Sequence, residues 1–255
     1  MSLLAFLQGL SPLEGWLNGA LIVLSILTSG MSAAVGIGGG TLLIITMAQV
    51  MPAAALIPVH GMVQLGSNVG RATLTWRHVD WALMSAFLPG VVIGALVAAW
   101  LMVRLPAGVL ELCIAAFVLL SCWGPALPHK ALGWGTTLMA GAATTLISSL
   151  VGASGPVVAA FVKHSQTTRL ARVATFSACM SFQHLTKAFV FGVAGFVFHE
   201  WLGLMVAMVL AGLVGTWLGL KLLRRLSEQR FDALFKWVLT LLALRLGWLG
   251  IERLG

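Results

Sequence analysis

Five polar residues could share one face of an otherwise apolar helix between residues 55 and 76. They are His60, Gln64, Ser67, Asn68 and Arg71, at spacings of four, three, one and three residues. At about 100° per residue, all five lie within about 100° of arc on one side of a helix. A guanidinium group beside amides and an imidazole offers several hydrogen-bond donors and a positive charge, so this face would suit an anion. The amides could instead tie helices together at about 1 kcal/mol each.

A partial copy of this polar face follows 116 residues later. A shift of that length aligns Gln183, His184 and Lys187 with the last three residues of the first face, and Phe176 and Met180 with its first two. Lys187 is the stronger of the two cations as a candidate, because residues 173–186 and 188–199 contain no Asp, Glu, Lys or Arg. A lysine inside a membrane span costs several kcal/mol and needs a functional or structural reason. His184, like the histidine of the first face, could carry a proton or pack as a neutral group.

Two glycine-rich segments could supply backbone donors to the same anion. GIGGG occupies residues 36–40, and GASGP, its partner under the same shift, occupies residues 152–156. A helix inside lipid tolerates such a break only where the released amide groups face protein, water or a ligand. A helix that restarts after the break also directs its positive end toward that point. The alternative is that small residues permit close helix packing. The candidate donors are Gly36, Gly38, Gly39, Gly40, Gly152, Ser154 and Gly155.

The elements that position these residues are membrane helices. The chain has 255 residues, of which 60% are hydrophobic and 9% charged, and its mean hydropathy is +1.02, which excludes a soluble globule. Residues 15–70 contain no charged side chain, although about 20 apolar residues already cross a bilayer. The net charge of +8 comes from Lys and Arg residues near the ends of apolar runs, a pattern typical of membrane topology rather than of nucleic-acid binding. We expect an all-α polytopic membrane protein.

The apolar runs predict about eight transmembrane segments in two four-segment repeats, residues 1–126 and 127–255. The first four segments are 16–49, broken near Gly36, then 55–76, 81–103 and 107–123. The second four are 131–162, broken near Gly152, then 170–198, 201–223 and 231–249. Each broken segment could be a bent helix or a re-entrant hairpin. Four crossings per repeat would make the two repeats parallel, whereas an odd number would invert one against the other.

Enzymatic chemistry has little support in the sequence. Most acidic residues fall near predicted segment ends, and Glu111 and Glu252 have no partner that the sequence places inside the membrane. No carboxylate pair is therefore available for acid or base catalysis. The three cysteines show no metal-binding spacing. We expect no enzyme activity, no metal and no cofactor.

Three stretches resemble the TauE/SafE sulfite exporter family, also called the toluene sulfonate uptake permease family. They are GIGGG, residues 59–81 (VHGMVQLGSNVGRATLTWRHVDW) and the degenerate copy GASGP. The resemblance implies a duplicated four-plus-four fold in a bacterial inner membrane and transport of sulfite, organosulfonates or similar small anions. The chain departs from the family pattern at Ser154 and Pro156, where glycines are usual, and has Lys187 at the basic position. Carried over, the pattern implies a cage of the seven break residues with Gln64, Asn68, Arg71, Gln183, His184 and Lys187, and His60 is a further candidate for substrate binding.

The resulting hypothesis is a secondary transporter in which two half-sites meet near the midplane and are exposed alternately to the two sides. Export is favoured, because a monovalent anion that leaves a cell at about 100 mV, negative inside, gains about 2.3 kcal/mol. The expected partners are a small anionic substrate and the lipid bilayer, without nucleic acid, and a homodimer is also allowed. The alternative is a membrane assembly protein whose polar faces join helices or a partner subunit.

Overall fold

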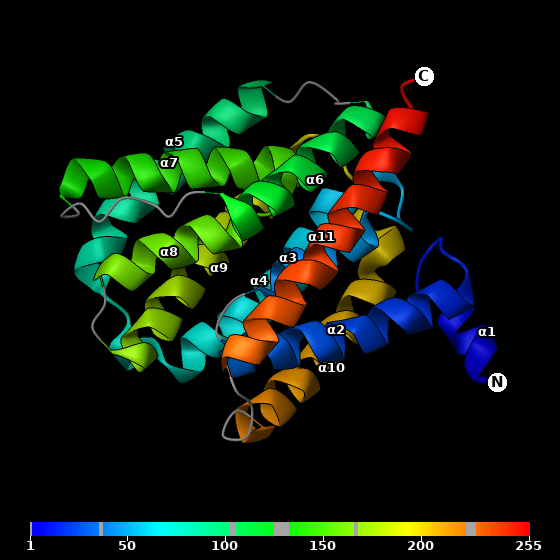
Figure 1. Cartoon of the computed structure of the whole chain (residues 1–255), viewed down its shortest axis with the longest axis horizontal. Coiled ribbons are helices and arrows are strands. Elements are labelled where there is room, and N and C mark those ends of the chain that lie inside the picture. Colours follow the sequence, from blue (N-terminus) through cyan, green and yellow to red (C-terminus); the bar gives the residue numbers. More distant parts are fainter. Residues whose placement is uncertain (1, 36–37, 102–105, 125–132, 166–167, 223–227) are drawn as a thin grey trace.

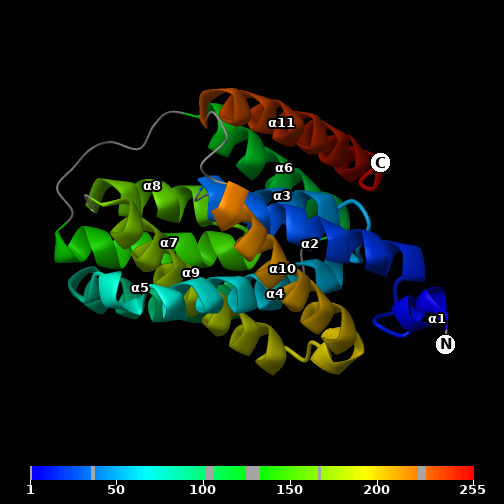
Figure 2. The same ribbon diagram turned by 90° about the horizontal axis from the view of Figure 1, so that it is seen from below.

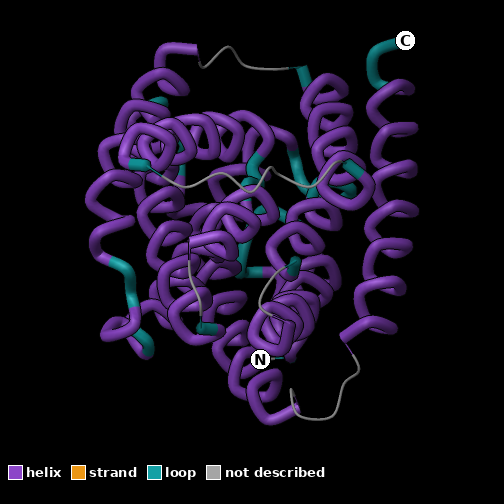
Figure 3. Tube along the Cα trace, turned by 60° about the vertical axis from the view of Figure 1, so that its left-hand side comes forward, coloured by secondary structure: helices purple, strands orange, loops and turns teal. Residues whose placement is uncertain are grey.

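A computed structural model describes residues 2–35, 38–101, 106–124, 133–165, 168–222 and 228–255 (Figures 1 and 3). Over these residues the chain is entirely helical, with no strand. The helices are α1 (Leu3–Gln8), α2 (Gly15–Val35), α3 (Gly39–Met47), α4 (Ala53–Leu74), η1 (Trp76–His78), α5 (Trp81–Leu101), α6 (Ala107–Trp123), α7 (Trp134–Val151), α8 (Gly155–Ser165), α9 (Arg169–Val193), η2 (Phe198–Trp201), α10 (Leu202–Leu222) and α11 (Glu228–Glu252).

Four described helices are long and apolar enough to cross a membrane. The stretches are Gly15–Ala33, Trp81–Trp100, Phe198–Gly219 and Ala233–Glu252, and Ala107–Trp123 is apolar but shorter. Helices α4 and α9 have 22 and 25 residues, but they carry the two polar faces and are correspondingly less apolar. The expectation of an all-helical membrane protein is confirmed, and the arrangement of eight segments in two repeats stays a prediction.

Helices from the two halves of the chain pack against each other in pairs. Helix α2 packs on α10, α5 on α7, α4 on α9, and α6 on α11. In Figure 2, α4 and α9 lie near the middle of the molecule, and α6 and α11 lie together along one side. The polar faces of α4 and α9 are thus brought together at a contact between the two halves.

Both broken segments reverse direction rather than bend. We call α2 with α3 the first hairpin, and α7 with α8 the second hairpin. Helix α3 returns beside α2: a Cβ added at Gly39 would overlap the carbonyl oxygen of Thr28, eleven residues earlier. Helix α7 ends at Gly152, which has the left-handed φ of +81° that favours glycine, and α8 then returns beside α7. The first break includes Gly36, which lies outside the described residues.

The two hairpins enter the molecule from opposite ends. In Figures 1 and 2, α2 starts near the N-terminus and α7 starts at the far end of the long axis, and both helices run toward the middle of the molecule.

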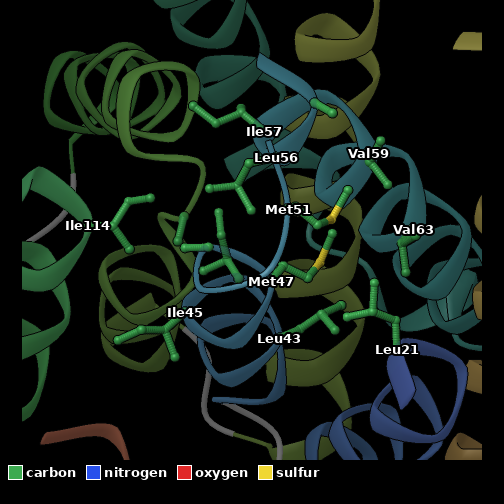
Figure 4. Close-up of a cluster of buried hydrophobic side chains, with 14 of the residues drawn as sticks. Leu21, Leu43, Ile45, Met47, Met51, Leu56, Ile57, Val59, Val63 and Ile114 are labelled. Carbon is green, nitrogen blue, oxygen red and sulfur yellow. The ribbon is translucent and has the colours of Figure 1, made fainter. Parts of the chain in front are cut away.

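A core of apolar side chains surrounds the returning arm of the first hairpin. Ile44, Ile45 and Met47 of α3 are fully buried, and the neighbouring α4 contributes Leu56 and Val59 (Figure 4). A helix of nine residues with buried apolar side chains on most sides is a core helix and not a span in contact with lipid. This packing fixes the start of α3, and with it one wall of the cavity described next.

Candidate functional site

A cavity lies where the two breaks meet the polar faces of α4 and α9. Its volume is about 40 Å³. By the same measure, one water molecule needs at least about 10–15 Å³. The space therefore suits about three waters or one oxyanion of a few heavy atoms. The lining residues are Ser32, Gly38, Gly40, Thr41, His60, Gln64, Asn68, Arg71, Gly152, Ala153, Ser154, Gly155, Phe176, Met180 and His184.

The polar face of α4 forms one wall of this cavity, as its spacing predicts. Arg71 Nη2 donates to Asn68 Oδ1 at 2.9 Å, and Asn68 Nδ2 donates to the backbone oxygen of Gln64 at 2.8 Å. The imidazole Nε2 of His60 lies 3.0 Å from the backbone oxygen of Gly40. No described carboxylate lies within 4 Å of Arg71. Arg71 Nη1 also donates to the Ser67 hydroxyl at 3.5 Å. The guanidinium has five N–H donors, so an anion in the cavity could accept from those that Asn68 and Ser67 do not occupy.

The second half contributes Ser154, Gly155 and His184. The His184 side chain is only 1% exposed, and neither of its ring nitrogens has a hydrogen-bond partner among the described residues. Its ring lies edge-on to the ring of His60, with centroids 6.1 Å apart, and Nδ1 of His60 also has no described partner. Buried polar groups are almost always hydrogen-bonded, so two histidines with vacant nitrogens beside a cavity indicate a place for water or a ligand.

Lys187 does not line the cavity. Its side chain is fully buried, and Nζ donates to the Ser148 hydroxyl at 3.1 Å, the Ser148 carbonyl at 3.4 Å and the Gly152 carbonyl at 3.1 Å. An ammonium group has three donors, and these contacts use all three. Lys187 thus joins α9 to the end of α7 and the second break, just behind the cavity wall.

Two further predicted site residues also pack behind the wall. Gln183 Oε1 accepts from the Ser154 hydroxyl at 2.8 Å, and Gln183 Nε2 donates to Thr144 Oγ1 at 2.6 Å, so this side chain joins α9, α7 and the second break. Gly39 lies against the backbone of α2, where it allows the close approach of the first hairpin. The interpretation that polar side chains tie helices together thus describes Gln183 and Lys187, and the close-packing interpretation of the glycines describes Gly39.

Five lining residues lie outside the predicted cage: Ser32, Thr41, Ala153, Phe176 and Met180. The shift of 116 residues contained a signal for the last two, since it aligns them with His60 and Gln64. Their apolar side chains gave no reason to expect them in an anion site.

The electrostatics of the cavity favour negative charge. Arg71 faces it directly, and the first turns of α3 and α8 reach it through Gly40, Thr41 and Gly155. The first backbone N–H groups of a helix have no intrahelical partner, and no side chain caps α3 at Gly38. Both helix starts thus add donors and the positive end of a helix dipole. Among the described residues, no group of three or more His, Cys, Asp or Glu side chains could hold a metal ion.

Apolar helices around a cavity that Arg71 lines define a multi-pass membrane protein. The chain belongs to the TauE/SafE sulfite exporter family, whose model matches residues 21–246 and so covers every residue that lines the cavity. This family consists of membrane transporters of sulfur-containing anions. No curated protein and no solved structure matches the chain.

Proposed function

We propose that the chain is a secondary transporter that exports small anions, such as sulfite or organosulfonates, across a bacterial inner membrane by alternating access. The observation that carries this proposal is the cavity between the two breaks, where Arg71 has no described carboxylate partner and His184 has no described hydrogen-bond partner. An anion there would accept hydrogen bonds from Arg71 and from the backbone N–H groups in the first turns of α3 and α8. The family membership supports a sulfur-containing anion.

Residues 1–126 and 127–255 would be two repeats in inverted orientation. Each repeat would consist of one hairpin and three further helices, α4 to α6 in the first and α9 to α11 in the second. The helix pairs agree with this symmetry, because exchanging the repeats converts the α2–α10 pair into α7–α5 and leaves the α4–α9 and α6–α11 pairs unchanged. Three crossings after a re-entrant hairpin make an odd number, which inverts the second repeat. A homodimer stays a prediction, because one chain supplies both hairpins and the cavity needs no second copy.

The membrane potential alone would drive export. One negative charge that leaves a cell at about 100 mV gains about 2.3 kcal/mol, which supports a concentration ratio of about fiftyfold. Rocking of one hairpin and its helices against the other would expose the cavity first to one side and then to the other. Because Lys187 and Gln183 brace the second break from behind, this hairpin would move as a unit with α9.

Flux measurements in liposomes test the proposal. Purified protein should release ³⁵S-sulfite from liposomes with an inside-negative potential, and reversing the potential should reverse the net flux. Arg71→Gln should lower the flux at subsaturating sulfite by about tenfold or more. Arg77→Gln is the matched control, because Arg77 is exposed in η1, stacks on Trp76 outside the cavity and should retain wild-type flux. Equal flux from protein-free liposomes, or wild-type flux from Arg71→Gln, would contradict the proposal.

A further inference from the structure

The two long walls of the cavity differ in chemistry. Helix α4 presents a continuous polar face, whereas α9 presents Phe176 and Met180 at the positions that the shift of 116 residues aligns with His60 and Gln64. Met180 is 5% exposed and Phe176 is partly buried, and both line the cavity. We call Phe176 and Met180 the apolar pair.

The apolar pair lies toward the Arg71 end of the cavity. Helices α4 and α9 pack in opposite directions: just beyond α4, the backbone N–H of Asp80 donates to Thr175 Oγ1 at 3.0 Å, near the start of α9. Toward the other end of α4, a Cβ added at Gly61 would lie 2.9 Å from Cε of Lys187. Phe176, next to Thr175, therefore lies at the same end as Arg71. An anion bound by this guanidinium would have the apolar pair on its opposite side.

A cavity with one polar and one apolar wall would favour anions that have one apolar side over anions that are polar on all sides. Each oxygen of a bound anion needs a donor, and α4 and the helix starts can supply donors on one side. The side chains of the apolar pair have no N–H or O–H group. An anion that is polar on all sides would leave polar atoms unpaired against Phe176 and Met180, which weakens binding. A methyl or similar substituent on that side would instead be removed from water.

We propose that the apolar pair makes the transporter selective for monovalent oxyanions that carry one small apolar substituent, with the charged end bound at Arg71 and the substituent against Phe176 and Met180. This inference rests on the proposed function and names the class of anion that the cavity prefers.

Methanesulfonate and sulfamate test the inference without confounding charge or size. Both are monovalent at neutral pH and nearly identical in shape, but sulfamate has an amine where methanesulfonate has a methyl group. Wild-type protein in liposomes should transport methanesulfonate with a kcat/KM at least about fivefold above that for sulfamate, because burial of a methyl group alone gives about fourfold and the amine leaves donors unpaired.

Three variants place the selectivity on the apolar pair. Met180→Gln and Phe176→His install the residues found at the aligned positions of α4, and either should reduce the ratio of kcat/KM for the two anions toward one. Met180→Leu, which keeps the wall apolar, should retain the wild-type ratio. Size-exclusion chromatography and tryptophan fluorescence check that each variant is folded. The ratio of the two kcat/KM values in the wild-type protein tests the inference even if a variant does not fold.

The outcomes separate this inference from the proposed function. A wild-type ratio near one, or an unchanged ratio in a folded Met180→Gln protein, would overturn the selectivity while leaving anion transport in place. If wild-type protein transports neither these anions nor sulfite, the proposed function itself fails.

Discussion

Gln183→Leu should destabilise the fold, whereas the same substitution at Gln64 should weaken anion binding. Both glutamines belong to the polar faces, but only Gln64 lines the cavity. The Gln183 amide makes two hydrogen bonds, to Ser154 at 2.8 Å and to Thr144 at 2.6 Å. The Gln64 amide makes no side-chain hydrogen bond to another described residue, and its Nε2 lies against Gly40 at the start of α3.

The expected magnitude follows from these contacts. Interhelical hydrogen bonds in membranes contribute on average about 0.6 kcal/mol and at most about 1.7 kcal/mol each. Loss of two such bonds in Gln183→Leu should lower the free energy of unfolding by about 1–3 kcal/mol. Gln64→Leu should change that free energy by less than about 0.5 kcal/mol, and should lower the apparent affinity for sulfite by about fivefold or more, because one donor for the anion is lost.

Reversible unfolding in mixed micelles, followed by circular dichroism, measures the stability of both variants, and flux into liposomes at varied sulfite concentration measures the affinity. If Gln64→Leu destabilises the protein as much as Gln183→Leu and leaves the affinity unchanged, then both glutamines serve helix packing and the distinction between cavity wall and support is wrong.

Three further predictions address the site and its frame. Arg71→Gln should weaken sulfite binding about 10- to 100-fold, the equivalent of one charge-assisted hydrogen bond, and Arg71→Lys should weaken it less, as isothermal titration would show. Gly152→Ala should lower the free energy of unfolding by about 1–2 kcal/mol in mixed micelles because its φ is +81°, whereas Gly135→Ala in α7, where an added Cβ meets nothing within 4 Å, should be neutral or stabilising. Arg253→Ala should destabilise the protein more than the double variant Arg253→Ala with Glu111→Leu does, because the single change leaves a buried carboxylate without its ion-pair partner; equal stabilities of the two variants would contradict this reading.

The helices could be predicted from the sequence because membrane burial leaves a simple pattern. The predicted segments 55–76 and 107–123 correspond to α4 (Ala53–Leu74) and α6 (Ala107–Trp123), and the breaks fall where glycine interrupts an apolar run. Whether each break was a bend or a reversal could not be predicted, since Gly152 permits either. The direction of the chain after each break depends on contacts between helices, such as that of Gly39 with Thr28.

The site could be predicted only in part, for a related reason. Helical spacing placed five residues of α4 on one face, and the structure brings four of them to the cavity, all except Ser67. The same spacing on α9 could not show that Lys187 would turn its three donors toward Ser148 and Gly152. The ion pair of Glu111 with Arg253 joins α6 to α11 across 142 residues, so no local pattern indicates it.

The position of a bound anion tests the central claim most directly. Selenite has the shape and charge of sulfite, and selenium gives an anomalous X-ray signal that locates it in a crystal. Crystals of the wild-type protein grown with selenite should show one selenium peak between the starts of α3 and α8, with the selenite oxygens within hydrogen-bond distance of Arg71, and crystals of Arg71→Gln should lack it. A peak elsewhere in the protein, or an empty cavity at a selenite concentration that saturates transport, would contradict the claim that the two glycine breaks form the anion site.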